Sequence, residues 1–120
     1  MALVVNTVGT SAYTNNPQFP GMNTQAASYT PTIQDANQII EFSAAGTLTV
    51  PPNASVPFPI GTTLTVMAFV TGAAAVAVAP GSGVTIRARG AFAHLNNQYS
   101  VGYLTQVRLN EWYFSGDIVA

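Results

Sequence analysis

His94, Ser100 and Asp117 are the residue types of a hydrolase triad, and His94 is the only histidine in the chain. A triad is recognised by geometry, and its serine commonly sits in a Gly-x-Ser-x-Gly turn. The neighbours of Ser100 do not form that motif. A lone histidine between apolar residues is more typical of a satisfied sheet residue, so we expect His94 to be structural.

The acidic residues Asp35, Glu41, Glu111 and Asp117 are the only carboxylates available for acid–base chemistry. A glycosidase needs two carboxyl groups about 5–9 Å apart. Three arginines are present to pair with these four acids. Ion pairing therefore accounts for the carboxylates better than a catalytic pair does.

Metal and phosphate sites lack their usual residues. The chain has no cysteine, which excludes thiolate zinc sites, disulfides and a cysteine nucleophile. No Asp-x-Asp run suggests calcium, and Gly81-Ser82-Gly83 is not followed by the lysine of a phosphate loop. We expect no enzyme activity, no cofactor and no metal.

Two further groups of side chains have both a functional and a structural interpretation. The C-terminal aromatic residues could stack on sugars if exposed, or anchor the core if buried, and the strand pattern favours burial. Arg87 and Arg89 are two residues apart, so they project from one face of one strand. They are either solvated or paired with acids of a neighbouring subunit. The aromatic residues are Tyr99, Tyr103, Trp112, Tyr113 and Phe114.

Charge is scarce throughout the 120 residues. Only 6% of them are charged, none is lysine, and the net charge is −1. Nucleic acids and anionic membranes are bound through clustered Lys and Arg, so neither is an expected partner. The most apolar stretch, 64–79, is shorter than the ~20 residues of a membrane helix. The N-terminus lacks the basic region of a signal peptide. Weak surface repulsion favours association with other subunits.

From residue 32 onward, short runs of β-branched and aromatic residues alternate with Gly, Pro and Asn. This pattern predicts an all-β fold, a jelly-roll-like β-sandwich over residues 29–120. One helical turn is expected within 33–40, with Thr32 as its cap. Strands are expected at about 40–42, 47–50, 62–70, 75–79, 84–88, 91–95, 98–109 and 112–116. The predicted core is Leu64, Val66, Val70, Val84, Ile86, Val101, Val107 and Trp112.

The strand at 62–70 is apolar on both faces in its second half, because Met67 and Phe69 alternate with core residues. A second layer or another subunit must therefore cover it. Residues 1–28 carry no charge and no helical period, and they predict an extended N-terminal arm. The arm is either a free terminus or a segment that orders on a neighbour, for which Val4, Val5, Tyr13 and Phe19 offer apolar contacts.

The residues from Tyr29 to Asp117 resemble a β-module of tailed-phage virion proteins, found in tail fibres, tail spikes and small capsid-associated proteins. The resemblance lies in Asp35-Ala36-Asn37-Gln38, Leu48-Thr49-Val50-Pro51-Pro52-Asn53, Phe58-Pro59-Ile60-Gly61-Thr62, Pro80-Gly81-Ser82-Gly83-Val84 and Glu111-Trp112. It implies a structural or attachment role without catalysis.

Because the module here has only a short arm, it is most similar to capsid decoration, or cement, proteins. That resemblance implies a trimer on the virion capsid surface that binds the major capsid protein, made in the host cytoplasm. Candidate interface residues are Val4, Val5, Tyr13, Phe19, Met67, Phe69, Arg87 and Arg89. The alternative is a tail fibre or tail spike module that recognises a host surface glycan.

Overall fold

The computed structural model describes residues 21–120, which form two β-sheets with almost no helix. Two 3-10 turns, η3 (Ile33–Asp35) and η4 (Arg89–Ala91), interrupt the strands. The all-β prediction is confirmed, and η3 is the helical turn expected after Thr32. The strands are β1 (Met22–Gln25), β2 (Ile39–Phe42), β3 (Gly46–Val50), β4 (Thr63–Ala68), β5 (Val76–Pro80), β6 (Thr85–Ala88), β7 (His94–Leu95), β8 (Val101–Arg108), β9 (Glu111–Gly116) and β10 (Ile118–Val119).

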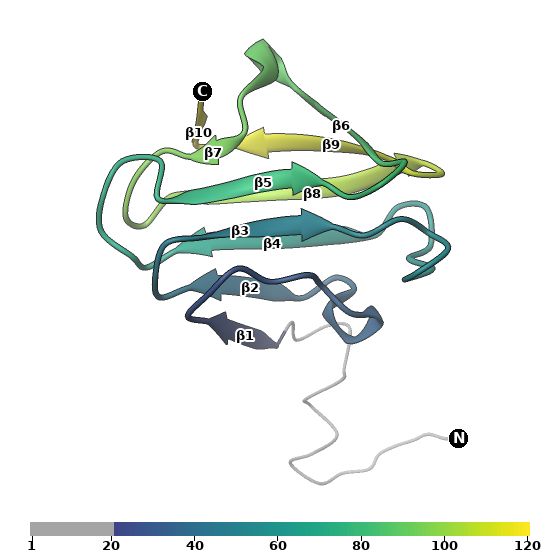
Figure 1. Ribbon diagram of the computed structural model, residues 1–120, viewed down its shortest axis with the longest axis horizontal. Helices are drawn as coiled ribbons and strands as arrows, with labels where there is room; N and C mark the ends of the chain where they lie inside the picture. The colour runs from purple at the N-terminus through teal and green to yellow at the C-terminus, as the bar shows by residue number, and fades with distance from the viewer. Residues whose placement is uncertain (1–20) are drawn as a thin grey trace, which may run out of the picture.

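The chain passes back and forth between the sheets as it advances. One sheet has the order β1-β2-β4-β8-β9-β6 and the other β10-β7-β5-β3. β1, β2 and β4 are parallel neighbours in the first sheet, while Tyr29, β3 and β5 are parallel neighbours in the second. Successive coils therefore stack from β1 toward β8 and β9 (Figure 1). A jelly roll is built from antiparallel strands, so that detail of the prediction is not confirmed.

The core lies between the sheets and follows the period of two expected for half-buried strands. In β4, Leu64 and Val66 are fully buried, while Met67 lies on the opposite face. Trp112 of β9 is also buried, and its ring packs edge-on against Phe58, 5.7 Å between centroids. The buried apolar residues of the core are Ile40, Phe42, Leu48, Val50, Phe58, Leu64, Val66, Ala68, Val76, Val78, Val84, Leu95, Leu104, Trp112 and Phe114.

The predicted facing of β8 is wrong. Val101 and Val107, expected in the core, are only half-buried and lie on the outer face, together with Tyr103. The residues that face the core are Gly102, Leu104 and Gln106. Val70 and Ile86, also expected in the core, are partly buried residues packed against it.

Gly102 and Gln106 face inward for two different physical reasons. A Cβ atom on Gly102 would lie 2.8 Å from both Leu95 Cδ2 and Phe114 Cε1, so any other residue there would force these buried side chains to shift. Gln106 is buried, but its Nε2 donates to the Phe58 carbonyl at 2.8 Å and its Oε1 accepts from the Asn110 amide at 3.2 Å. A buried amide satisfied in this way is stable inside a core.

Residues 22–25, expected to belong to the arm, form β1 and pair with β2. Asn23 of β1 also donates to Asp35 Oδ1 at 2.8 Å and to the Tyr29 hydroxyl at 3.0 Å. The folded unit therefore begins before residue 29. The interface candidates Val4, Val5, Tyr13 and Phe19 lie outside the described residues. Within residues 21–120, no helix has the length and apolarity needed to span a bilayer.

Candidate functional site

The nominal triad residues are not arranged as a triad. Ser100 is buried and donates directly to Asp117 Oδ2 at 2.7 Å, whereas a triad places an imidazole between serine and carboxylate. The Asn97 amide donates to Ser100 Oγ at 3.0 Å, and Asn96 Nδ2 donates to Asp117 Oδ1 at 3.1 Å. These contacts close the turn before β8, so Ser100 and Asp117 have a structural explanation. His94 lies in β7 opposite Val119 of β10, but its Nδ1 is buried without a hydrogen-bond partner in the described residues, so the side chain is not the fully satisfied one expected.

These hydrogen bonds change the pKa of Asp117. The hydroxyl of Ser100 first, and the amide of Asn96 second, hold the pKa of the Asp117 carboxyl below its ordinary value of 3.8. Hydrogen bonds donated to a carboxylate stabilise its charged form. In the part of the chain that the structure describes, no three His, Cys, Asp or Glu side chains gather where they could hold a metal ion.

The outer face of the six-stranded sheet is the broadest candidate surface. We call it the open face, because none of its side chains is buried. Its centre is almost uncharged: Thr65 pairs across strands with Tyr103, and Tyr103 pairs with Ser115. The members of the open face are Met22, Thr24, Ile39, Glu41, Thr63, Thr65, Met67, Thr85, Arg87, Val101, Tyr103, Thr105, Glu111, Tyr113 and Ser115.

Three of the five C-terminal aromatic residues are exposed, contrary to the favoured interpretation. Tyr99, Tyr103 and Tyr113 are 73%, 46% and 47% exposed, whereas Trp112 and Phe114 are buried as expected. Tyr99 has φ of 70°, the left-handed region that bulky side chains rarely adopt. Its ring lies 6.5 Å from that of Phe69, which is 53% exposed. These two rings form an exposed aromatic pair where β4 ends and β8 begins.

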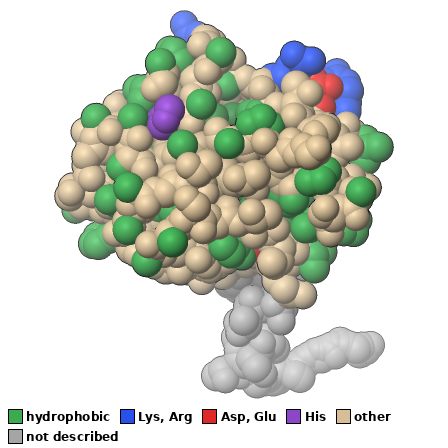
Figure 2. Space-filling model, in the orientation of Figure 1, with side chains coloured by type: hydrophobic (Ala, Val, Ile, Leu, Met, Phe, Trp, Pro, Cys, Tyr) green, Lys and Arg blue, Asp and Glu red, His purple; other side chains and the backbone are tan. Residues whose placement is uncertain are grey.

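The four-stranded side of the molecule is also poor in charge. Figure 2 shows the charged side chains of this view mainly in two separate places along its upper edge, with polar and apolar groups over most of the rest. One group of charged side chains is held together by ion pairs. Arg87 Nε and Arg108 Nη1 both approach Glu111 Oε2, at 2.8 and 3.4 Å. Arg87 first, and Arg108 second, lower the pKa of Glu111. Arg87 thus pairs with an acid of its own chain.

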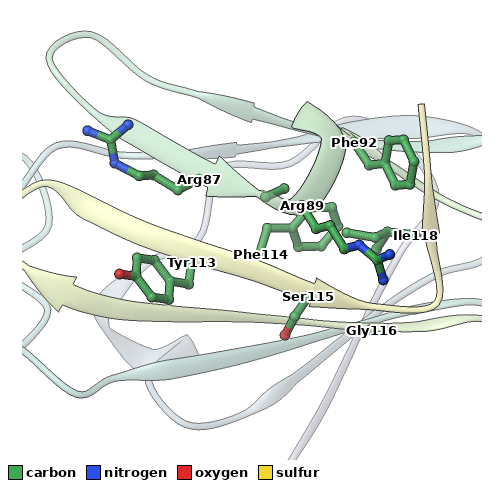
Figure 3. Close-up of a pocket in the computed structure, with 9 residues that line it drawn as sticks. Arg87, Arg89, Phe92, Tyr113, Phe114, Ser115, Gly116 and Ile118 are labelled. Carbon is green, nitrogen blue, oxygen red and sulfur yellow. The ribbon is translucent and has the colours of Figure 1, made fainter.

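A pocket of about 550 Å³ lies between the end of β6, η4 and the strands β9 and β10. We call it the Arg89 pocket, and it is lined by Arg87, Arg89, Phe92, Tyr113, Ser115 and Ile118 among others. β6 ends at Ala88, and Arg89 belongs to η4. The two arginines therefore do not project from one face of one strand, as the sequence predicted. Figure 3 shows the Arg89 guanidinium beside Ile118 and Arg87 pointing toward the other end of β6.

The turn that carries Arg89 depends on its glycine. Gly90 has φ of 66°, and a Cβ atom there would lie 2.9 Å from the Phe92 ring. Ala91 follows with φ of 57°, so two successive residues are left-handed. This conformation turns the chain sharply after β6 and brings Phe92 to the pocket wall. Sequence reasoning identified both arginines but missed Phe92, Ser115 and Ile118, which become neighbours only through this turn and the β9–β10 bend.

The predicted interface residues that the structure describes belong to two parts of the fold, the end of β4 and the region of β6 and η4, and β8 and β9 lie between β4 and β6 in the sheet. Met67 lies half-buried on the open face, Phe69 is exposed beyond the end of β4, and Arg87 and Arg89 line the pocket. Comparisons with family models, curated proteins and solved structures find no match for this chain.

Proposed function

We propose that this protein is a non-enzymatic structural subunit of a tailed-phage virion, a decoration protein that binds the major capsid protein as a trimer. The observation that carries the proposal is the open face, six strands wide and almost free of charge at its centre. Interfaces are depleted of charge at their core and enriched in Tyr and Met. Met22, Tyr103 and Tyr113 are the exposed members of that kind.

The resemblance to phage β-modules supplies the identity of the partner in this proposal. The chain composition supports it independently, because 6% charged residues leave little repulsion between neighbouring subunits. The aromatic pair of Phe69 and Tyr99 provides a second apolar contact, at the end of β4. One contact surface for the capsid and another for a sister subunit are what a trimeric decoration protein requires.

A binding experiment with purified capsid shells tests the open face. Tyr103→Lys places a charge at its centre, and we expect capsid occupancy to fall by at least about 30-fold in affinity, the effect of losing one strong interface residue. Ile60→Lys is the matched control, because Ile60 is 64% exposed in the loop before β4. Wild-type protein that does not bind shells, or two variants that bind equally well, would contradict the proposal.

Light scattering tests the trimer separately. The free protein at micromolar concentration should show three times the 12.5 kDa subunit mass. The interface of such a trimer should bury more than about 1,000 Å² in total. A mass of one subunit would count against a preformed trimer.

A second candidate function is recognition of a host surface glycan by a tail fibre or tail spike module. The specific observation in its favour is the exposure of Tyr99, Tyr103 and Tyr113. Exposed tyrosines present both a ring face and a hydroxyl to a ligand. This candidate requires binding of a sugar by the isolated protein, which the decoration function does not.

A further inference from the structure

Among the arginines of the described residues, Arg89 is the one without an ion pair. Arg87 and Arg108 share the carboxylate of Glu111, but within 21–120 no carboxylate lies within the 4.0 Å of an ion pair with Arg89. The other three acids make their contacts elsewhere: Asp35 accepts from Tyr29 and Asn23, Glu41 from Thr24, and Asp117 from Ser100. The guanidinium of Arg89 is therefore a positive charge at a pocket wall without a partner from this part of the chain.

The rest of the pocket is both apolar and hydroxylated. Phe92 and Ile118 supply apolar walls and Ser115 adds a hydroxyl group, whereas Figure 3 shows the Tyr113 hydroxyl pointing away from Arg89. The volume of about 550 Å³ lies within the range of small-molecule sites. A ligand that fits these walls has one negative charge, an apolar surface and groups that hydrogen-bond with hydroxyls.

Arg89 is the pocket arginine that has no ion pair in the described residues, and its charge and shape restrict the class of ligand further. A guanidinium binds a carboxylate through two parallel hydrogen bonds, which matches one negative charge with one cation. A phosphate carries more charge and is usually held by several cations or by a loop of backbone amides. In the Arg89 pocket the second arginine, Arg87, is already paired with Glu111 at 2.8 Å.

We propose that the Arg89 pocket binds a carboxylated sugar of the uronic acid type. Arg89 binds the carboxylate, Phe92 and Ile118 contact the apolar face of the ring, and Ser115 hydrogen-bonds to one of its hydroxyl groups. The inference rests on the second candidate function, glycan recognition, and adds a location and a ligand class to it. The pocket shares Arg87, Tyr113 and Ser115 with the open face, but sugar binding by the isolated protein is measured separately from capsid binding.

Titration of the full-length, ¹⁵N-labelled protein with sodium glucuronate, followed by NMR, tests the pocket. We expect the amide signals of Arg89, Phe92 and Ser115 to shift, with an affinity at least about tenfold greater than for glucose. Arg89→Gln should weaken glucuronate binding by about 10- to 100-fold, the effect of losing a charged hydrogen-bonding partner. Arg108→Gln is the control, because Arg108 also carries a charge but does not line the pocket, and its affinity should stay within about twofold.

Other outcomes overturn the proposal in distinguishable ways. Equal affinity for glucuronate and glucose, or an Arg89→Gln variant that binds normally, removes the role of Arg89. Inorganic phosphate that binds as tightly as glucuronate shows a general anion site and no sugar site. Sugar-dependent shifts confined to Tyr99 and Phe69 would move the site to the aromatic pair, which would leave glycan recognition standing while overturning the Arg89 pocket.

Discussion

At the residue scale, Asp35 is the buried acid of the described chain, and its neighbours explain how burial is tolerated. Its Oδ2 accepts from the Tyr29 hydroxyl at 2.6 Å and from the Thr32 amide at 2.8 Å, while Asn23 donates to Oδ1. Burying a charge is costly unless its hydrogen bonds are made. The cluster also joins β1, the bridge at Tyr29 and η3.

Removing the Tyr29 hydroxyl should therefore destabilise the fold. Tyr29→Phe leaves Asp35 Oδ2 with one donor fewer, and we expect a loss of about 1–3 kcal/mol in the free energy of unfolding by urea titration. Tyr103→Phe is the matched control, since Tyr103 is 46% exposed on the open face, and should cost less than about 0.5 kcal/mol. Equal losses in the two variants would contradict a structural role for the cluster.

The hydrogen bonds at Asp117 predict a dependence of stability on pH. Because its pKa is lowered on folding, Asp117 contributes stability that is present above its ordinary pKa of 3.8 and is lost as pH falls through the lowered value. Ser100→Ala removes the main cause of that lowering. Thermal melts from about pH 5 to about pH 2 should therefore show a shallower acid-induced decline for the variant than for wild type. A steeper or identical decline would argue against this hydrogen bond.

At the element scale, alternation predicted some strands well and one strand badly. β4 was predictable because Leu64 and Val66 alternate with Thr63 and Thr65, which leaves one choice of buried face. β8 offered apolar or aromatic residues on one face and Gly102, Leu104 and Gln106 on the other. The sequence cannot reveal that Phe114 and Leu95 fill the space above Gly102, or that loop carbonyls satisfy Gln106. The Arg89 pocket was missed for the same reason. Its residues meet through the turn at η4, and such contacts leave no periodic pattern in the sequence.

The true facing of β8 predicts an unusual order of mutational effects. Gln106→Ala should cost more stability than Val107→Ala, although valine is the more hydrophobic residue. The former leaves the Phe58 carbonyl and the Asn110 amide without their partner in the core, an expected loss of about 1–3 kcal/mol. The latter trims a half-buried side chain that does not face the core, and it should cost less than about 1 kcal/mol. Chemical denaturation of both variants measures the order, and the reverse order would restore the original assignment of the strand.

At the scale of the whole molecule, the coils stack without a detectable sequence repeat, because the spacing between paired residues is unequal. Met22 pairs with Ile39, 17 residues on, whereas Ile39 pairs with Thr65, 26 residues on. Loops of unequal length between equivalent strands remove any fixed period, so the parallel pairing could not be predicted. The same stacking leaves β1 at one edge of the six-stranded sheet.

The position of β1 separates two truncations that remove nearly the same length of chain. Deleting residues 1–20 keeps every described strand, and we expect the free energy of unfolding to change by less than about 1 kcal/mol. Deleting 1–28 also removes β1 and the Asn23 donor, which exposes the edge of β2. Several lost hydrogen bonds, at about 1 kcal/mol each, should then lower stability by at least about 2 kcal/mol.

If residues 1–20 serve assembly, the shorter deletion should weaken capsid occupancy in the shell-binding experiment without altering the melt. Unchanged occupancy would show that the assembly contacts lie wholly within residues 21–120, which leaves the open face and the aromatic pair as their sites.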